Sequence, residues 1–161
     1  MKPTRIFIHG LQGSAQGTKA RFFRSRYPEM MIPDFLGDLD QRMARLETVL
    51  TGHRSIICVG SSYGGVMALL FAQKHPQWVR KLVLLAPALS WYKFSPRPTG
   101  KLSLPVIIYH GYNDEVVPWM PVHRRAHDVL KNLAFHLLAD DHCLSKSFSR
   151  LDWPRLLDPP L

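Results

Sequence analysis

The chain has 161 residues, of which 46% are hydrophobic, so it can bury one core and is too apolar to be intrinsically disordered. Its formal net charge is +9, which can indicate a nucleic-acid or membrane partner, but the basic residues are scattered and accompany no nucleic-acid-binding motif. No apolar run approaches the roughly 20 residues of a membrane-spanning helix, and no signal segment follows Met1. We therefore expect one domain over residues 1–161, in a cytoplasmic protein that binds no nucleic acid and has no membrane span.

Taken in chain order, short apolar runs alternate with segments whose apolar residues recur at helical spacing. The apolar runs predict strands at residues 5–8, 30–32 (a weak one), 56–59, 81–86, 105–111 and 135–138. The helical spacing and its capping or breaking residues predict helices at residues 18–26 with Thr18 as N-cap, 39–50, from the turn at 60–64 to about 75, 120–130, and within 143–157.

This alternation predicts an α/β fold, with a doubly wound, mostly parallel sheet of about six strands and helices on both faces. The chain shows no internal repeats, linkers or low-complexity segments, which agrees with one domain. In open sheets of this kind, the functional site lies at the carboxyl ends of the strands.

The clearest motif is Gly60-Ser61-Ser62-Tyr63-Gly64, which fits the pattern G-x-S-x-G between a predicted strand and a predicted helix. A serine at such a corner has its hydroxyl held clear of the sheet, and small flanking residues let the chain fold back on itself. Only Ser62 fits the register, because Ser61 would need glycines at Val59 and Tyr63. The motif predicts a nucleophilic serine; the alternative is a glycine-rich turn without chemistry.

A nucleophilic serine needs a base within hydrogen-bond reach and a carboxylate that orients the base. Asp114 comes after the strand at 105–111, and His142 is the histidine in the loop after the last strand. Because Ser62, Asp114 and His142 each follow a predicted parallel strand, we expect them at one edge of the sheet. The alternatives are that Asp114 caps the following turn and that His142 has no role.

The reaction of such a serine also needs donors for a developing oxyanion. One is expected from the backbone N–H of Tyr63, at the start of a helix whose dipole favours negative charge. The other is expected from the loop after the first strand, from the N–H of Leu11 or, as second choice, of Gln12.

No spacing among the remaining histidines and the cysteines resembles H-E-x-x-H or a pair of C-x-x-C motifs, so we expect no metal and no cofactor. His9 and His110 each precede a glycine at the end of a predicted strand, which favours a role in shaping loops. Cys58 lies inside an apolar run and is expected to be a small core residue. Asp140 and Asp141 are typical of a turn, and one of them is a candidate for positioning the loop of His142.

Together these pieces resemble the α/β-hydrolase superfamily, and the small size is similar to compact bacterial esterases without a cap domain, the YqiA-type esterases among them. The matching segments run from near the start to near the end of the chain: His9-Gly10-Leu11, residues 60–65, residues 84–87, residues 110–118 and Asp141-His142. The resemblance implies Ser62 as nucleophile, Asp114 as acid, His142 as base, and the Leu11 and Tyr63 amides as the oxyanion hole. It also implies a serine hydrolase that cleaves a carboxylic ester or thioester of a small acyl compound through an acyl-enzyme.

Many members of this superfamily carry a lid between the strands that end here at Ala86 and start at Pro105. Only residues 88–104 are available for one in this chain, too few for a helical cap domain. We therefore expect an open, shallow site whose rim binds substrate through Trp91, Tyr92 and Phe94. The alternative is that these aromatic side chains merely pack over the edge of the sheet.

Two other functions remain open from the sequence. One is a hydrolase-like protein that binds an acyl ligand or a protein partner without catalysis, and the other is a basic nucleic-acid binder. The residues do not specify the acyl group, the alcohol or the oligomeric state, since this fold carries many chemistries.

Overall fold

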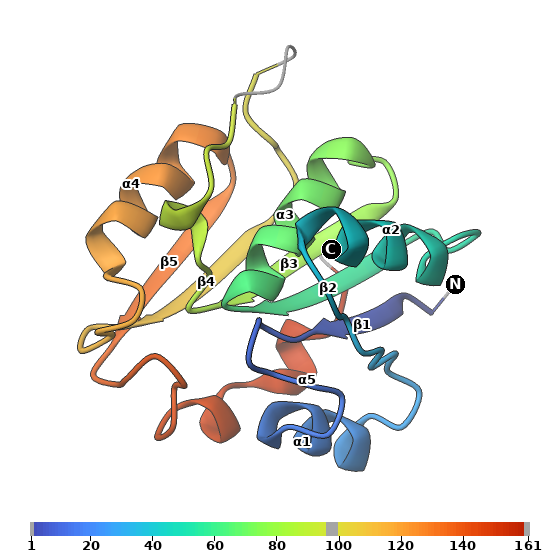
Figure 1. The fold of residues 1–161 in the computed structure, drawn as a ribbon, viewed down its shortest axis with the longest axis horizontal. Helices are drawn as coiled ribbons and strands as arrows, with labels where there is room; N and C mark the ends of the chain where they lie inside the picture. Colours follow the sequence, from blue (N-terminus) through green and yellow to red (C-terminus); the bar gives the residue numbers. More distant parts are fainter. Residues whose placement is uncertain (1, 96–99, 160–161) are drawn as a thin grey trace.

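The computed structural model describes residues 2–95 and 100–159, so residues 96–99 of the segment at 88–104 lie outside the described residues. Its elements follow one another as β1 (Thr4–Ile8), α1 (Thr18–Arg26), α2 (Leu39–Val49), β2 (Ile56–Ser61), α3 (Tyr63–Lys74), β3 (Val79–Leu85), η1 (Leu89–Trp91), β4 (Val106–Gly111), α4 (Trp119–Val129), β5 (Leu133–Leu138), η2 (Phe148–Arg150) and α5 (Trp153–Leu156). The predicted alternation of strands and helices is confirmed (Figure 1).

The described strands form one parallel sheet in the order β1-β2-β3-β4-β5. The predicted α/β fold with a parallel sheet is confirmed, and the described sheet has five strands, one fewer than the predicted number of about six. The weak segment at 30–32 makes only an isolated bridge, in which Met31 pairs with Ile6 on the free edge of β1. Pro33 has no N–H and cannot extend this ladder, which explains why the segment does not become a strand.

The sheet is doubly wound because the chain reverses direction at β1. From β1 it passes through α1 to Met31, on the outer side of β1, and then returns through α2 to β2, which pairs with the opposite side of β1. The helices accordingly cover both faces, with α2, α3 and α4 on one face and α1 and α5 on the other (Figure 1). Such a reversal leaves a crevice at the carboxyl ends of the neighbouring strands.

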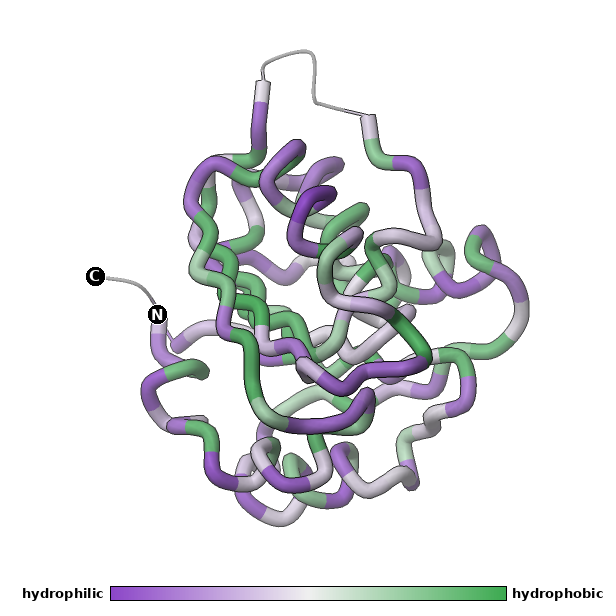
Figure 2. Tube along the Cα trace, turned by 90° about the vertical axis from the view of Figure 1, so that its left-hand side faces the viewer, coloured by the Kyte–Doolittle hydropathy of each residue, from purple (hydrophilic) through white to green (hydrophobic). Residues whose placement is uncertain are grey.

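The core has two layers, because side chains alternate between the faces of a strand. Ile6 and Cys58 pack toward α2, α3 and α4, whereas Phe7 and Val59 pack toward α1 and α5. β2 and β3 are buried on both faces, as expected for continuous apolar runs (Figure 2, hydrophobic segments in green). Cys58 is fully buried as predicted, and burial raises the pKa of its thiol to about 12.

Helix ends differ from the predictions in two places. The N-cap of α1 is Gly17, without a side-chain hydrogen bond, and Thr18 is already the first helical residue. The tail forms η2 and the four-residue α5 instead of one helix, since the backbone is extended at Leu151 and α5 starts anew with Asp152 as its cap. No helix in the described ranges combines the length and apolar character needed to cross a bilayer.

The short α5 is fixed by two basic side chains from the sheet. Lys81 of β3 is 6% exposed, and its ammonium donates to the carbonyl oxygens of Arg155, Leu156 and Asp158. Arg5 of β1 donates through Nε to the carbonyl of Leu157, at 2.9 Å. These bonds satisfy the free carbonyls at the end of a helix.

Candidate active site

Ser62 lies at the sharp corner between β2 and α3. Its φ of 54° and ψ of −115° place a non-glycine residue in a sparsely allowed region, which is typical of strained functional corners. Neighbouring backbone holds the corner, because the Ser62 amide donates to Leu85 O at 2.9 Å and the Ala88 amide donates to Ser62 O at 3.0 Å. The strained corner is therefore held by the last residue of β3 and by the segment that follows it.

Close backbone packing joins this corner to the end of β1. A Cβ added at Gly64, in the first turn of α3, would collide with the carbonyl oxygen of Ile8. A Cβ added at Gly10 would lie 3.2 Å from Ser62 Cβ and 3.7 Å from the Tyr63 amide nitrogen. The loop after β1 thus lies directly against the serine and the start of α3.

The structure brings together the three side chains that the sequence singled out. His142 Nε2 lies 3.1 Å from Ser62 Oγ, and His142 Nδ1 lies 2.7 Å from Asp114 Oδ2. Ser62 follows β2, Asp114 follows β4 and His142 follows β5, so the parallel sheet delivers all three to one edge. The Asp114 side chain is fully buried, whereas the His142 side chain is 19% exposed. A solute can therefore reach the imidazole while the carboxylate stays inside.

The Asp114 carboxylate has a partner on each oxygen. Oδ1 accepts from the amides of Val116 at 2.9 Å and Val117 at 2.7 Å, so Asp114 does organise the following turn, as the alternative interpretation proposed. Oδ2, which faces His142, also lies 3.2 Å from His110 Nε2. Turn formation and contact with His142 are therefore compatible, because they use different oxygens.

His110 was expected only to shape a loop, and it contacts the acid as well. It is completely buried, and its Nε2 donates to the carbonyl of Val117 at 2.8 Å. Burial is the main influence on His110 and lowers the pKa of its imidazole. A neutral ring with its proton on Nε2 fits both the carbonyl and the neighbouring carboxylate. The sequence signal for this contact was the spacing of four residues between His110 and Asp114.

Asp140 holds the loop that carries His142. It is 2% exposed, and its carboxylate accepts from the amides of Asp141 at 2.8 Å, Lys146 at 3.1 Å and Ser147 at 2.8 Å. Burial acts to raise the pKa of Asp140, but the hydrogen bonds from Ser147, Asp141 and Lys146 outweigh it and lower that pKa. The Asp140 carbonyl also accepts from the Asn113 amide, at 3.1 Å, which ties this loop to the loop of Asp114.

Two backbone amides near Ser62 are available to a ligand. Tyr63 is the first residue of α3, so its N–H has no acceptor within the helix. Within the part of the chain that the structure describes, the Leu11 amide donates to no protein acceptor. His9 fixes this loop, because Nδ1 donates to Gly10 O at 2.7 Å and Nε2 accepts from the Phe35 amide at 3.0 Å.

The aromatic residues of segment 88–104 differ in their solvent exposure. Trp91 is 50% exposed and Tyr92 is 37% exposed, which agrees with a place on a rim. Phe94 is only 5% exposed and packs in the core, so its expected place on the rim was wrong. Its ring lies 5.2 Å from that of Tyr92. Tyr112, which follows β4, is a further exposed aromatic residue, at 62%.

Two hollows in the described surface lie away from these residues. One runs along α4, with a volume of about 500 Å³, and the other, of about 380 Å³, lies beside Lys81, Tyr109 and His136. Ser62, Asp114 and His142 line neither of them.

A protein-family model and a curated protein both match this chain. The model of the alpha/beta hydrolase fold family matches residues 14–97, just over half of the chain. A protein named as an esterase, NocK from Nocardia uniformis subsp. tsuyamanensis, is 31% identical over 113 residues, which cover 68% of this chain and 31% of that protein. The chain thus spans about a third of the length of this curated relative.

Solved structures show the same architecture. A hydrolase from Agrobacterium vitis S4 matches with a TM-score of 0.77 at 21% identity, covering 98% of this chain and 88% of that one. Est1E from Butyrivibrio proteoclasticus matches with a TM-score of 0.75 at 19% identity, covering 96% and 85%. Alpha/beta hydrolase domain-containing protein 10 from mouse matches with a TM-score of 0.74 at 21% identity, covering 91% and 84%. The family model and the shared fold together place this chain in the α/β-hydrolase family.

Proposed function

We propose that this chain is a serine hydrolase that cleaves carboxylic esters or thioesters through an acyl-enzyme on Ser62. The observation that supports this most is the hydrogen-bonded row from Ser62 Oγ through His142 to Asp114, at 3.1 Å and 2.7 Å. Those distances lie within the reach that proton transfer requires. Membership of a hydrolase family and the esterase name of the NocK relative agree with this proposal.

Acylation begins with the proton of the Ser62 hydroxyl. The carboxylate of Asp114 accepts a hydrogen bond from Nδ1–H of His142, which leaves the Nε2 lone pair free to take that proton. Ser62 Oγ then attacks the ester carbonyl carbon and forms a tetrahedral intermediate. The amides of Leu11 and Tyr63 donate to its oxyanion, and the dipole of α3 adds to their effect.

The intermediate collapses when the bond to the leaving group breaks. The His142 imidazolium returns its proton to the departing alcohol or thiol, which leaves the acyl group esterified to Ser62. Water then attacks the acyl carbon while His142 takes a proton from it, and a second collapse releases the carboxylic acid and restores the serine. The reaction follows a ping-pong course.

The exposed rim favours substrates that need no deep pocket. Leu11 at 48%, Trp91 at 50% and Tyr112 at 62% exposure come from the loops after β1, β3 and β4. These loops lie at the same edge of the sheet as Ser62, because the strands are parallel. The rim suits short acyl chains, or a larger amphiphile that lies across the surface.

The test uses the neighbouring serine as a matched control. Ser62→Ala should lower kcat/KM for a short p-nitrophenyl ester by at least about 10³-fold, because the nucleophile is lost. Ser61→Ala, one residue earlier at the end of β2, should keep activity close to that of the unchanged chain. Circular dichroism checks that both variants fold. A Ser62→Ala protein that still turns over the ester would refute the proposal.

A further inference from the structure

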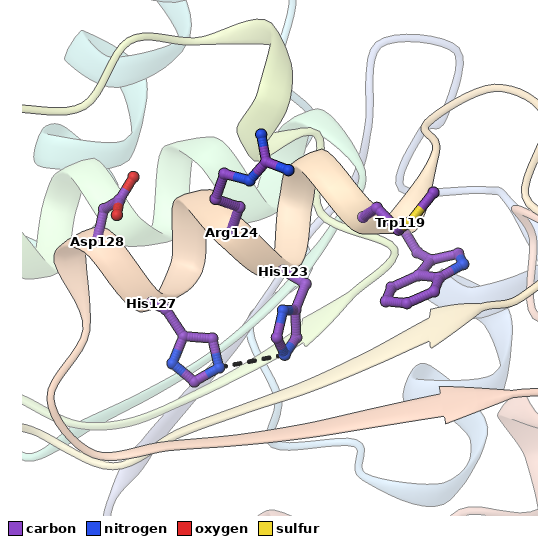
Figure 3. Close-up of a pocket in the computed structure, with 6 residues that line it drawn as sticks. Trp119, His123, Arg124, His127 and Asp128 are labelled. Carbon is purple, nitrogen blue, oxygen red and sulfur yellow. Dashed lines mark hydrogen bonds between the residues drawn. The ribbon is translucent and has the colours of Figure 1, made fainter.

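Two histidines on α4 lie outside the site described above and face each other across one turn of the helix. His123 and His127 are four residues apart, and their Nε2 atoms are separated by 3.2 Å. Figure 3 shows both rings on the same side of α4, whereas Arg124 and Asp128 point to the other side. All four residues line the α4 groove of about 500 Å³. The pair is therefore accessible, and its charged neighbours point away from it.

The distance between the two nitrogens fits a shared metal ion. Zinc lies about 2.0–2.1 Å from an imidazole nitrogen, so a separation of 3.2 Å corresponds to an N–metal–N angle of about 100–106°. That angle is close to the tetrahedral value that zinc adopts in proteins. Imidazole nitrogens also suit copper and nickel, whereas magnesium and calcium prefer oxygen ligands.

Packing holds one of the two rings in place before any ion arrives. The His123 ring stands edge-on to Phe135 of β5 at 4.8 Å and to Trp119 at 6.2 Å. His127 is exposed and is free to adjust. In the free protein, the N–H of one Nε2 donates a hydrogen bond to the other Nε2, and a metal ion would take the place of the shared hydrogen.

We propose that His123 and His127 bind one divalent transition-metal ion of the zinc, copper and nickel class through their Nε2 atoms. No third His, Cys, Asp or Glu completes a cluster with them in the described ranges, so water or an added ligand fills the other positions. The site is independent of the hydrolase proposal, because neither histidine contacts Ser62, Asp114 or His142.

The experiment titrates ZnCl₂ into the untagged full chain at pH 7.5 and follows histidine side chains by NMR and binding by calorimetry. One equivalent of Zn²⁺ should shift the imidazole signals of His123 and His127, and MgCl₂ should not. His127→Gln should weaken Zn²⁺ binding by at least about tenfold, since even the loss of a partner that merely orients a ligand costs that much.

His136→Gln is the matched control, because His136 is also exposed but lies on β5, where it stacks on Tyr109 at 4.9 Å. This variant should bind Zn²⁺ as tightly as the unchanged chain. Because His127 is exposed, its replacement should not unfold the protein, and circular dichroism checks this. Unchanged Zn²⁺ affinity in His127→Gln, or no saturable binding by the unchanged chain, would overturn the site.

Discussion

Asp114 lies between two imidazoles that have different surroundings. The His142 side chain is 19% exposed and donates to Oδ2 at 2.7 Å, whereas the His110 side chain is fully buried at 3.2 Å from the same oxygen. The buried ring stays neutral because desolvation disfavours its charged form. A neutral donor beside Asp114 adds no positive charge that would compete with His142 for the carboxylate. In our proposal this arrangement favours the imidazolium formed when Ser62 loses its proton.

The burial of His110 predicts a pH dependence of stability. Because burial lowers the pKa of His110 in the folded chain, the unfolded chain binds more protons once the pH falls below about 6.5. The free energy of unfolding should therefore decline from about pH 6.5 downward, until the lowered pKa is reached. In His110→Gln this part of the decline should disappear, even though the variant is less stable overall.

Urea unfolding at a series of pH values between 7.5 and 5 measures this slope, with His136→Gln as an exposed-histidine control. The control should keep the slope of the unchanged chain. An identical slope in His110→Gln would show that His110 does not take up a proton on unfolding in this range.

At the scale of elements, the loop after β1 and the start of α3 form a single unit around Ser62. Gly10 makes their close approach possible, since a methyl group there would stand 3.2 Å from Ser62 Cβ. That distance is tighter than ordinary contact, so the loop would have to move by a few tenths of an ångström. Movement of the loop displaces the Leu11 amide, to which we assign half of the oxyanion hole.

Gly10→Ala should therefore lower kcat while the free energy of unfolding changes little. We expect a loss of about tenfold to 100-fold, since small displacements of groups around a reacting centre have effects of this size. Gly17→Ala in the same loop is the control, because a methyl group there meets Ser14 O at 3.4 Å, an ordinary contact. Steady-state kinetics on a p-nitrophenyl ester separates kcat from KM. Equal kcat values for both variants would count against the role of this loop.

The elbow at Ser62 and the positions of Asp114 and His142 could be predicted, because strand ends are visible as apolar runs and parallel strands share an edge. Burial of Phe94 could not be predicted, because it depends on how segment 88–95 folds back onto the core. The bonds of Asp140 to amides six and seven residues later depend on the same kind of loop closure.

At the scale of the whole molecule, the covering of one face of the sheet depends on the contacts that fix α5. α5 has only four residues, and isolated helices of this length are not stable. Trp153 and Leu156 pack against the sheet, and Lys81 and Arg5 bind the carbonyls that follow. Burial lowers the pKa of Lys81, which is consistent with an ammonium that has exchanged water for carbonyl oxygens.

Lys81→Met should destabilise the chain by about 1–3 kcal/mol, because it leaves the carbonyls of α5 without a donor inside the protein. Thermal unfolding and limited proteolysis of the C-terminal segment report this loss. Lys131→Met is the control, since Lys131 is exposed, and it should change stability by less than about 0.5 kcal/mol. A Lys81→Met protein as stable as the control variant would mean that the ammonium does not hold α5.

Reaction of the whole chain with a fluorophosphonate tests the central proposal most directly, because such a reagent modifies a serine only when a neighbouring base activates its hydroxyl. Intact mass and peptide mapping should find one adduct per chain on Ser62, and none when Ser62→Ala is treated in the same way. Replacement of His142 by alanine should slow labelling strongly while Ser61→Ala leaves it unchanged. A folded, unmodified Ser62 after prolonged exposure, or an adduct on another residue, would contradict the assignment of Ser62 as the nucleophile.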